Sequence, residues 1–195
     1  GTDEHGQKVE KAARDAGVPP QEFTDRVSQN FRDLARELDI SNDDFIRTTE
    51  ARHHKSTQEI WRAMAANNNG DIYQSTYKGW YSVRDEAYFD EAELTDAPDG
   101  KKLAPSGAEV NWVEEPSYFF RLSAWKKWLL EYYETNRRFI QPESRRNEIL
   151  GFLRQPLGDL CISRPKKRLA WGIELPFDQR YDAYGWVDAL TNYVS

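Results

Sequence analysis

The stretch Tyr184-Gly185-Trp186-Val187-Asp188-Ala189-Leu190-Thr191-Asn192-Tyr193-Val194 decides how the rest of the chain is interpreted. It begins with apolar and aromatic residues typical of a strand, turns at an aspartate, and continues with apolar residues at helical spacing. A helix would place four of these residues on one face, at offsets of three, four and seven: Trp186, Ala189, Leu190 and Tyr193. Such a face can hold an unbranched apolar side chain. On spacing alone, ordinary core is the favoured interpretation of the same four residues, because most aromatic stripes simply pack.

The composition of the chain narrows the class of protein. Its 195 residues are enough for one good-sized core or two small ones, and 13% of them are aromatic, with seven Trp, as in a packed globular protein. The sequence has no long apolar run, so we predict no membrane span. The single cysteine, Cys161, cannot form an internal disulfide, which favours a reducing cytoplasm. A net charge of −6 indicates that any RNA contact is local or lies outside this chain.

A second informative stretch is Gly1-Thr2-Asp3-Glu4-His5-Gly6. It has the pattern of a strand's end that runs into a helix, with Gly17 as the stop of that helix. An aspartate at the carboxyl end of a strand lies where α/β folds bind ligands. Asp3 could also cap the following helix. His5 could face a nucleotide or simply cap.

Between these two stretches, the residue pattern changes at Asn67–Gly70, from helical spacing to short aromatic runs. This change marks the best domain boundary. Before it, Pro19-Pro20 starts a long helix, whose apolar residues, three or four apart, predict a core-facing side: Phe23, Val27, Phe31, Leu34 and Leu38. A short strand at Phe45–Thr49 and a helix at 53–66 follow. His53 and His54 would point about 100° apart on that helix, so we expect surface or structural roles rather than a shared metal.

After the boundary, residues 71 to about 122 form short aromatic runs separated by turn residues, which predicts strands. Ser123 is then expected to cap a helix rich in Trp and Tyr, and Pro142 to start another helix. Pairs of arginines lie between and after these helices. The run Arg164–Arg168 has four cations in five residues, which could contact the acceptor end of a tRNA or form a solvated loop.

Together, the two end stretches resemble methionyl-tRNA synthetase, a family of class I aminoacyl-tRNA synthetases. The resemblance continues in the family's order and with near-family spacing through the segments Phe45–Thr49, Gly70–Tyr73, Tyr77–Tyr81, Tyr118–Ser123, Cys161–Pro165 and Trp171–Ile173.

The resemblance implies an α/β fold with an incomplete parallel, Rossmann-like nucleotide-binding fold that is interrupted by a smaller α+β connective-peptide insert. Residues 1–66 would form the first part of the catalytic core, 67–168 the insert, and 169–195 the return to the core. Many relatives carry a zinc knuckle with a Cys-x-x-Cys pair just after the Tyr-x-Gly-x-Tyr segment. Here Tyr81 is followed by Ser82 and Asp85, and the chain has one cysteine, so we predict no structural zinc and no other metal site.

The same resemblance implies roles for particular residues. Asp3 would hold the amino group of methionine, and four residues would line the pocket for its side chain: Trp186, Ala189, Leu190 and Tyr193. Arg164 would approach the site and pair with Asp3, with His5 as a further supporting residue. Gly185 stands where relatives usually have a larger β-branched residue, which puts the local geometry in doubt.

Members of the family activate methionine with ATP, with Mg as the accompanying ion, and transfer it from methionyl-adenylate to tRNA(Met). The two signature motifs that bind ATP, of the His-x-Gly-His and Lys-Met-Ser-Lys-Ser types, do not occur in this sequence. We therefore expect no catalytic residue in this chain. We also expect it to be part of a larger enzyme, inactive alone, with most tRNA contacts elsewhere.

Other synthetases of class I and a non-catalytic module are the alternatives to this function. Synthetases for leucine, isoleucine or valine carry an editing insert that is larger than the interval from Asn67 to Leu169, and cysteine enzymes need metal-binding cysteines at the pocket. The alternative from a different class is a non-catalytic, Trp-rich interaction module built on a synthetase scaffold.

Overall fold

The computed structural model describes residues 1–67, 69–98 and 100–195. Asn68, within the expected boundary at Asn67–Gly70, lies outside the described residues. The helical elements are α1 (Gln7–Asp15), α2 (Pro20–Glu37), α3 (Ala51–Ala66), η1 (Glu91–Glu93), α4 (Leu122–Thr135), α5 (Glu143–Arg154), α6 (Trp186–Ala189) and η2 (Leu190–Tyr193). The strands are β1 (Ile72–Ser82), β2 (Ala87–Phe89), β3 (Thr95–Asp96), β4 (Lys102–Leu103), β5 (Glu109–Phe120), β6 (Leu160–Cys161), β7 (Ser163–Pro165), β8 (Glu174–Leu175) and β9 (Asp178–Ala183).

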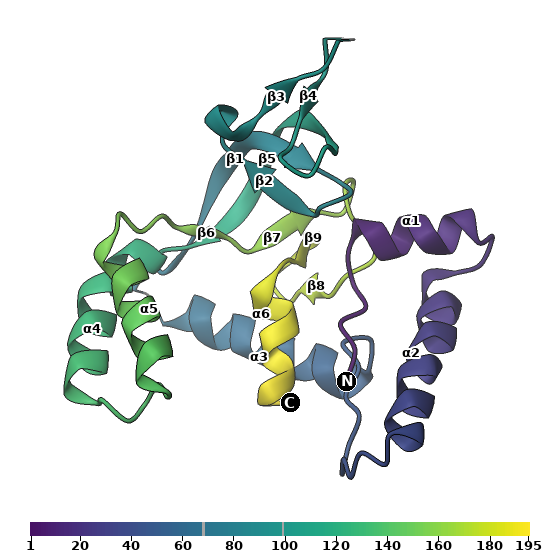
Figure 1. The fold of residues 1–195 in the computed structure, drawn as a ribbon, viewed down its shortest axis with the longest axis horizontal. Coiled ribbons are helices and arrows are strands. Elements are labelled where there is room, and N and C mark those ends of the chain that lie inside the picture. The colour runs from purple at the N-terminus through teal and green to yellow at the C-terminus, as the bar shows by residue number, and fades with distance from the viewer. Residues whose placement is uncertain (68, 99) are drawn as a thin grey trace.

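Two antiparallel sheets contain these strands (Figure 1). The larger sheet has the order β2-β1-β5-β4-β3, and β6 pairs with the end of β5. The smaller sheet has the order β7-β9-β8. The strands expected after residue 71 are therefore present. Because β7 pairs with β9, the last residues of the expected insert already belong to a sheet with the returning segment.

The fold is mixed α/β as predicted, but the expected parallel sheet is reduced to one isolated bridge between Thr2 and Arg47. The N–H of Thr2 donates to the carbonyl of Ile46 at 3.1 Å, and the N–H of Thr48 donates to the carbonyl of Thr2 at 3.2 Å. A strand needs consecutive paired residues, and within Phe45–Thr49 only Arg47 has a bridge partner. The strand expected at Phe45–Thr49 is therefore a single bridge.

A core cluster fastens α3, the smaller sheet and the C-terminal segment together. Its buried members come from α3, from β8 and β9, and from the residues that directly precede β7 and β8: Trp61, Ile162, Ile173, Leu175, Tyr181 and Ala183. Val187 of α6 packs against this cluster. Burial of a side chain such as the fully covered Trp61 contributes roughly 2–3 kcal/mol, so this cluster fixes the position of α6 on α3.

The apolar side of α2 is more open than the sequence predicts. Phe31, Leu34 and Leu38 are 51%, 49% and 62% exposed, whereas the buried residues of this helix are Thr24 and Ser28. The expectation of a core-facing stripe is therefore wrong for these residues. The helix packs on α1.

Helix α4 begins at Leu122, and Ser123 is not its cap. The carboxylate of Asp159 lies at this helix end, where its Oδ1 accepts a hydrogen bond from the N–H of Ser123 at 3.0 Å. A carboxylate at a helix N-terminus satisfies an N–H and complements the helix dipole. The second expected helix follows Pro142 as predicted. None of the helices in the described ranges combines the length and the apolar character that crossing a membrane requires.

Candidate functional site

The first residues of the chain and its C-terminal segment meet at Asp188. This aspartate is 4% exposed, and its two carboxylate oxygens have different partners. Oδ2 lies 2.6 Å from Nδ1 of His5, and Oδ1 lies 2.9 Å from Nε2 of His53. Burial by itself would raise the pKa of Asp188, but the hydrogen bonds with His5 and His53 outweigh it, so the pKa lies below its usual value. Asp188 is therefore an ionised anchor that holds both imidazoles.

Among the histidines, His53 is fully buried and structural, which confirms one of the two roles expected for it. His54 is half-buried, and its ring centre lies 5.5 Å from that of His5. Burial, followed by the neighbouring His5, lowers the pKa of His54. Within the residues that the structure describes, no group of three or more His, Cys, Asp or Glu side chains could hold a metal ion.

The segment Gly1–Gly6 is held from the other side by Trp171. The indole Nε1 of Trp171 donates to the carbonyl of Glu4 at 2.6 Å, and the N–H of Gly6 donates to the carbonyl of Trp171 at 3.3 Å. The ring of His5 meets the indole edge-on, with 5.6 Å between the centres. His5 is therefore a packed, hydrogen-bonded residue. It neither caps α1, whose N-cap is Gly6, nor stands free to face a nucleotide.

Glu4 is a member of the site that the sequence did not reveal. It is 4% exposed, and both of its carboxylate oxygens pair with Arg47, at 2.8 Å from Nε and 2.9 Å from Nη2. The hydroxyls of Thr2 and Thr49 each donate to it at 2.6 Å. Burial would raise the pKa of Glu4, but the hydrogen bonds from Arg47, Thr2 and Thr49 lower it below its usual range. This pairing fixes the backbone on which Asp3 is presented.

Asp3, between these two anchored residues, keeps an exposed carboxylate. No ion pair among the described residues neutralises it, and it does not cap α1. It lies at a hollow of about 280 Å³ that is also lined by Phe23, Val27 and Phe31. Surrounding protein atoms and then the charge of Asp188 raise the pKa of Asp3, with the nearby His5 acting in the opposite direction. The end of the Asp3 side chain reaches solvent, whereas the part next to the backbone is surrounded by protein atoms. No positively charged side chain in the described residues forms an ion pair with the carboxylate.

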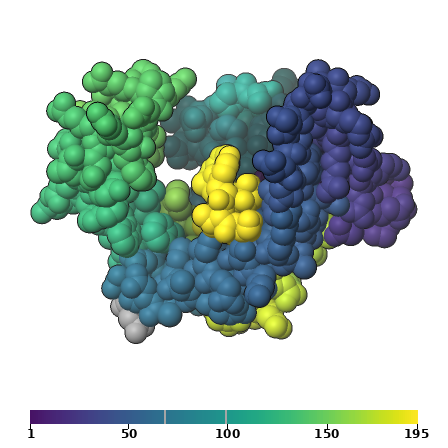
Figure 2. All heavy atoms as spheres, turned by 90° about the horizontal axis from the view of Figure 1, so that it is seen from below, coloured from purple at the N-terminus to yellow at the C-terminus, as the bar shows by residue number. Residues whose placement is uncertain are grey.

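The aromatic face predicted at the C-terminal end lies on the surface. Trp186, Leu190 and Tyr193 are 72%, 51% and 81% exposed, and Ala189 is half-buried. The opposite side of the same segment contains the buried Asp188 and Thr191. The interpretation of the four residues as ordinary core is therefore wrong. Figure 2 shows this segment in yellow at the surface, between the green α4–α5 hairpin and the dark blue α2.

Gly185 makes the turn that precedes this face. Gly185 is the N-cap residue of α6, and its φ is +70°, in the region that residues with side chains rarely adopt. A glycine therefore suits the backbone at this turn.

Arg164, expected to pair with Asp3, pairs elsewhere. It is 2% exposed, and its Nη1 lies 2.6 Å from Oε1 of Glu115 and donates to the hydroxyl of Tyr88. Its guanidinium stacks on aromatic rings, with 4.1 Å to the ring centre of Tyr184 and 4.7 Å to that of Tyr81. The reason is topological, because β7 packs against β5 and brings Arg164 to Glu115 first. No ion pair or hydrogen bond joins it to Asp3 in the described part of the chain. Arg164 instead connects the larger sheet to Tyr184, which precedes the C-terminal face.

Comparisons with known proteins cover the chain from end to end. The family model described as tRNA synthetases class I (M) matches residues 1–195. The methionine-tRNA ligase of Rickettsia typhi is 55% identical over 195 residues, and that of Brucella suis biovar 1 is 53% identical over the same length. The chain spans about 37% of the length of each of these relatives.

Solved structures give the same result. The methionyl-tRNA synthetase of Mycobacterium tuberculosis bound by methionyl-adenylate is 49% identical, with a TM-score of 0.87 over 100% of this chain and 38% of that chain. The apo form of the same enzyme has a TM-score of 0.72 at 47% identity, over 89% of this chain and 34% of that chain. Since the family model matches every residue and these relatives are about half identical, the chain belongs to the class I tRNA synthetases, in the methionine (M) family.

Proposed function

We propose that this chain is the methionine-recognition part of a methionine-tRNA ligase, an enzyme that forms methionyl-adenylate from methionine and ATP and transfers the methionyl group to tRNA(Met). The observation that carries this proposal is the contact between His5 and Asp188. It brings the unpaired carboxylate of Asp3 close to the exposed face of Trp186, Ala189, Leu190 and Tyr193, two features that lie at opposite ends of the sequence. The charge of Asp188 acts on the pKa of Asp3, which reflects the same proximity.

The two features suit the two ends of methionine. A carboxylate without a counter-charge accepts charge-assisted hydrogen bonds from an ammonium group, which is the role that we propose for Asp3. Exposed aromatic rings beside small and apolar side chains can cover a thioether, and a sulfur atom gains further from contact with the rings. Arg164 and His5 support the site indirectly, since Arg164 fixes Tyr184 and His5 fixes Asp188.

In the proposed reaction, a carboxylate oxygen of methionine attacks the α-phosphorus of ATP, and pyrophosphate leaves. The acyl group then passes from the adenylate to a hydroxyl of the terminal ribose of the tRNA, which releases AMP. ATP and its Mg ion supply the leaving group and charge neutralisation, and we assign no residue of this chain to them. The contribution of this chain is to hold methionine in position, which lowers the entropic part of the barrier.

We also propose that residues 1–66 and 169–195 belong to the catalytic core and that residues 67–168 form the connective-peptide insert between them. The absence of a structural zinc stays a prediction, which elemental analysis of the purified protein tests. We also propose a cytoplasmic location, because protein synthesis uses methionyl-tRNA there.

The decisive experiment is amino-acid-dependent exchange of pyrophosphate into ATP, with the full-length protein that contains this chain. We expect exchange with methionine and none with leucine, isoleucine or cysteine. Exchange with another amino acid would refute the proposed substrate. A folded full-length protein without exchange for any amino acid would favour the Trp-rich interaction module instead.

A further inference from the structure

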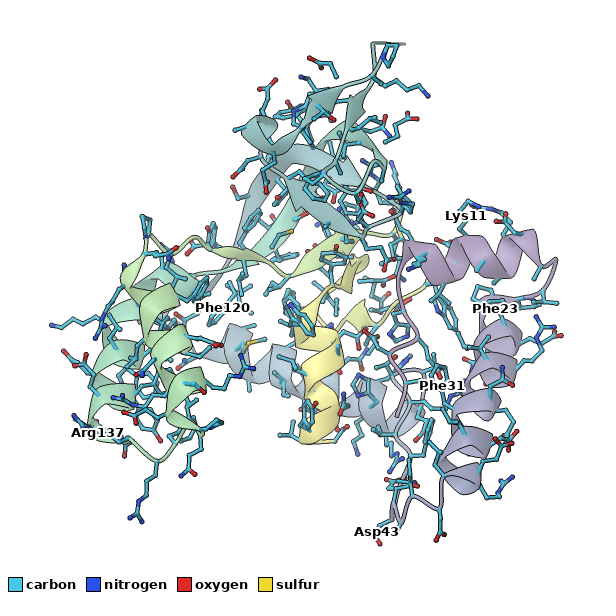
Figure 3. All side chains as sticks on the ribbon, in the orientation of Figure 1. Lys11, Phe23, Phe31, Asp43, Phe120 and Arg137 are labelled. Atoms are coloured by element: carbon cyan, nitrogen blue, oxygen red, sulfur yellow. The ribbon has the colours of Figure 1, made fainter. Side chains whose placement is uncertain are left out.

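The turn between β1 and β2 brings one carboxylate of the larger sheet to the start of α1. Glu86, in this turn, is half-buried, and its Oε1 accepts a hydrogen bond from the N–H of Lys8 at 2.9 Å. In Figure 3, α1 carries the label of Lys11, and the helix starts next to the strands of the larger sheet. Glu86 and Lys8 are 78 positions apart in the sequence, so their contact joins the proposed insert to the first part of the proposed core.

Glu86 supplies the cap that α1 otherwise lacks. The N-cap residue of this helix is Gly6, which has no side chain, and Lys8 is the second residue of the helix, where the N–H has no partner inside the helix. A carboxylate at this place satisfies the N–H and faces the positive end of the helix dipole. Gly6 leaves room for it, since a Cβ at Gly6 would lie only 2.8 Å from Oε1 of Glu86. The first turn of α1 is therefore held by a side chain from the larger sheet.

The same residue also contacts the C-terminal segment. The hydroxyl of Tyr184 donates to the backbone carbonyl of Glu86 at 3.4 Å. Tyr184 lies two residues before Trp186, and its ring stacks on the buried guanidinium of Arg164. Glu86 therefore reaches both of the segments that carry the proposed methionine-binding side chains.

The backbone of Glu86 indicates that these contacts hold it in place. Its φ is 51°, in the left-handed region that residues with a Cβ adopt only at a cost in energy. Non-glycine residues stay in this region where the surrounding structure fixes them, and such residues gather at functional sites. The contacts with Lys8 and Tyr184 are the ones that lie on the side of the proposed methionine site.

Glu86 also lies within electrostatic reach of Asp3. Surrounding protein atoms and the charge of Asp188 raise the pKa of Asp3 most, and the charge of Glu86 adds to the same shift. Asp3 is only three residues away from the N-cap of α1. Glu4 and His5 hold the middle of this short segment, and Glu86 holds its far end, where α1 begins. A displacement of the first turn of α1 would therefore be passed on to Asp3.

We propose, on the basis of the methionine-recognition function, that Glu86 is a positioning residue for methionine. Its carboxylate fixes the first turn of α1 and with it Asp3, which would bind the ammonium group, and its carbonyl holds Tyr184 ahead of the aromatic face. The carboxylate acts through its hydrogen bond and does not touch the substrate. The site then has its full affinity for methionine only while the turn between β1 and β2 lies against α1.

The test uses the full-length protein with Glu86→Ala, Glu86→Gly and Glu86→Gln. Alanine and glycine both remove the hydrogen bond with Lys8, and glycine also suits the left-handed backbone, so this pair separates the loss of the contact from a loss of stability. Glutamine keeps an oxygen that can accept the hydrogen bond. The matched control is Asp85→Asn, because Asp85 is the neighbouring carboxylate in the same turn but bonds to Ser106, within the proposed insert.

Two measurements report on these variants. Methionine-dependent pyrophosphate exchange gives kcat and the KM values for methionine and for ATP, and amide hydrogen exchange follows the first turn of α1 without any substrate. We expect Glu86→Ala and Glu86→Gly to raise the methionine KM roughly fivefold to tenfold, as for the loss of one helix cap, with kcat and the KM for ATP within about twofold. Amides of the first turn should exchange faster in both variants. The Glu86→Gln and Asp85→Asn proteins should stay within about twofold of the unchanged protein in every constant.

The inference fails if the methionine KM is unchanged in Glu86→Ala. A KM that returns to its original value in Glu86→Gly would show a merely structural role, because the two variants lack the same hydrogen bond. An equal rise in Glu86→Gln would assign the effect to charge, and an equal rise in Asp85→Asn would assign it to the turn as a whole; each result would overturn the role of the hydrogen bond. Absence of exchange in the unchanged protein would instead refute the proposed function, and amide exchange would still test the contact between Glu86 and α1.

Discussion

His5 and Asp188 are 183 residues apart in the sequence, yet Nδ1 of the histidine lies 2.6 Å from a carboxylate oxygen of the aspartate. His53 binds the other oxygen of the same carboxylate. One buried charge therefore holds together the segment that presents Asp3, the first turns of α3, and the segment that presents Trp186. A buried anion that is shared by two imidazoles makes the candidate site sensitive to single changes at its centre.

Replacement of Asp188 by Asn should destabilise the protein by about 2–4 kcal/mol, because two buried imidazoles lose their anionic partner. Urea unfolding of the full-length protein measures this loss. The control is Asp33→Asn, which changes an exposed carboxylate on α2 and should cost within about 0.5 kcal/mol. Since the folded pKa of Asp188 is lowered, its contribution is present above the ordinary aspartate pKa and is lost as pH falls through the folded value. Equal stability of the two variants would contradict the anchoring role.

Asp182 should give the opposite dependence on pH. It is 1% exposed, one of its oxygens has no hydrogen-bond partner, and burial raises its pKa from 3.8 to about 6. A raised folded pKa for an acid means that stability is greatest below the unfolded value and is lost as pH rises through 6, by about 3 kcal/mol in total. Asp182→Asn should remove this loss between pH 4 and 6, which chemical unfolding at a series of pH values detects.

The control for Asp182 lies in the same strand. Asp178 accepts hydrogen bonds from Arg180 and Tyr118, with Arg180 the main cause that lowers its pKa to about 2. It is therefore ionised in both states above pH 5, and Asp178→Asn should leave the slope between pH 5 and 6 unchanged. A slope that persists in the Asp182 variant would show that another group titrates there.

Arg164 and Arg168 contact the same carboxylate with different burial, so they form a matched pair. Arg164 is buried and binds Oε1 of Glu115 at 2.6 Å, whereas the side chain of Arg168 is 43% exposed and binds Oε2 at 3.2 Å. Arg164→Ala should cost about 3–5 kcal/mol in the free energy of unfolding because it leaves a buried carboxylate without its main partner. Arg168→Ala should cost less than about 1 kcal/mol. Thermal unfolding of both variants checks this order, and a reversal would disprove the assignment of Arg164 as the principal connector.

Trp186→Ala separates recognition from stability. The side chain is 72% exposed, so its loss should leave the free energy of unfolding within about 0.5 kcal/mol of the original. If the ring covers methionine, the methionine KM in pyrophosphate exchange should rise roughly 10- to 100-fold, as expected for the loss of one well-packed aromatic contact. Trp112→Ala is the control, because Trp112 is also half exposed but lies on β5 in the larger sheet. An unchanged KM in the Trp186 variant would remove this residue from the pocket.

Local patterns predicted much of this fold. Helical spacing and the positions of Gly and Pro located α1 with its stop at Gly17, the start of α2 at the pair Pro19-Pro20, and the helix that follows Pro142. These features depend on neighbouring residues, which is why a sequence reports them. The family resemblance, which rests on motifs at both ends, added the role of a methionine pocket for the face around Trp186, and that role stays a prediction.

The remainder depends on contacts between distant residues. Spacing alone showed that Trp186 and Tyr193 share a face but not that this face is exposed, since exposure depends on where α3 and the smaller sheet pack. Arg164 pairs with Glu115 rather than with Asp3 because β7 packs against β5, a contact between segments that lie far apart in the sequence. Asp188 looked like a turn residue, and its two histidines lie too far away in sequence for any local pattern to join them.

The hydrogen bonds between Trp171 and the segment that contains Glu4 also set an order of events during biosynthesis. The two residues are 167 positions apart, so a ribosome that adds about 5–20 residues per second makes Trp171 roughly 8–30 seconds after Glu4. During that interval, Asp3 and its neighbours have neither Trp171 nor Asp188 to hold them. The helices and the β1–β5 pair can form while the chain is still growing, but the hydrogen bond between Glu4 and Trp171 can form only after residue 171 has been made. A ribosome that stalls before residue 171 would therefore expose a chain with folded parts and an open site, the form that chaperones and proteases would encounter first.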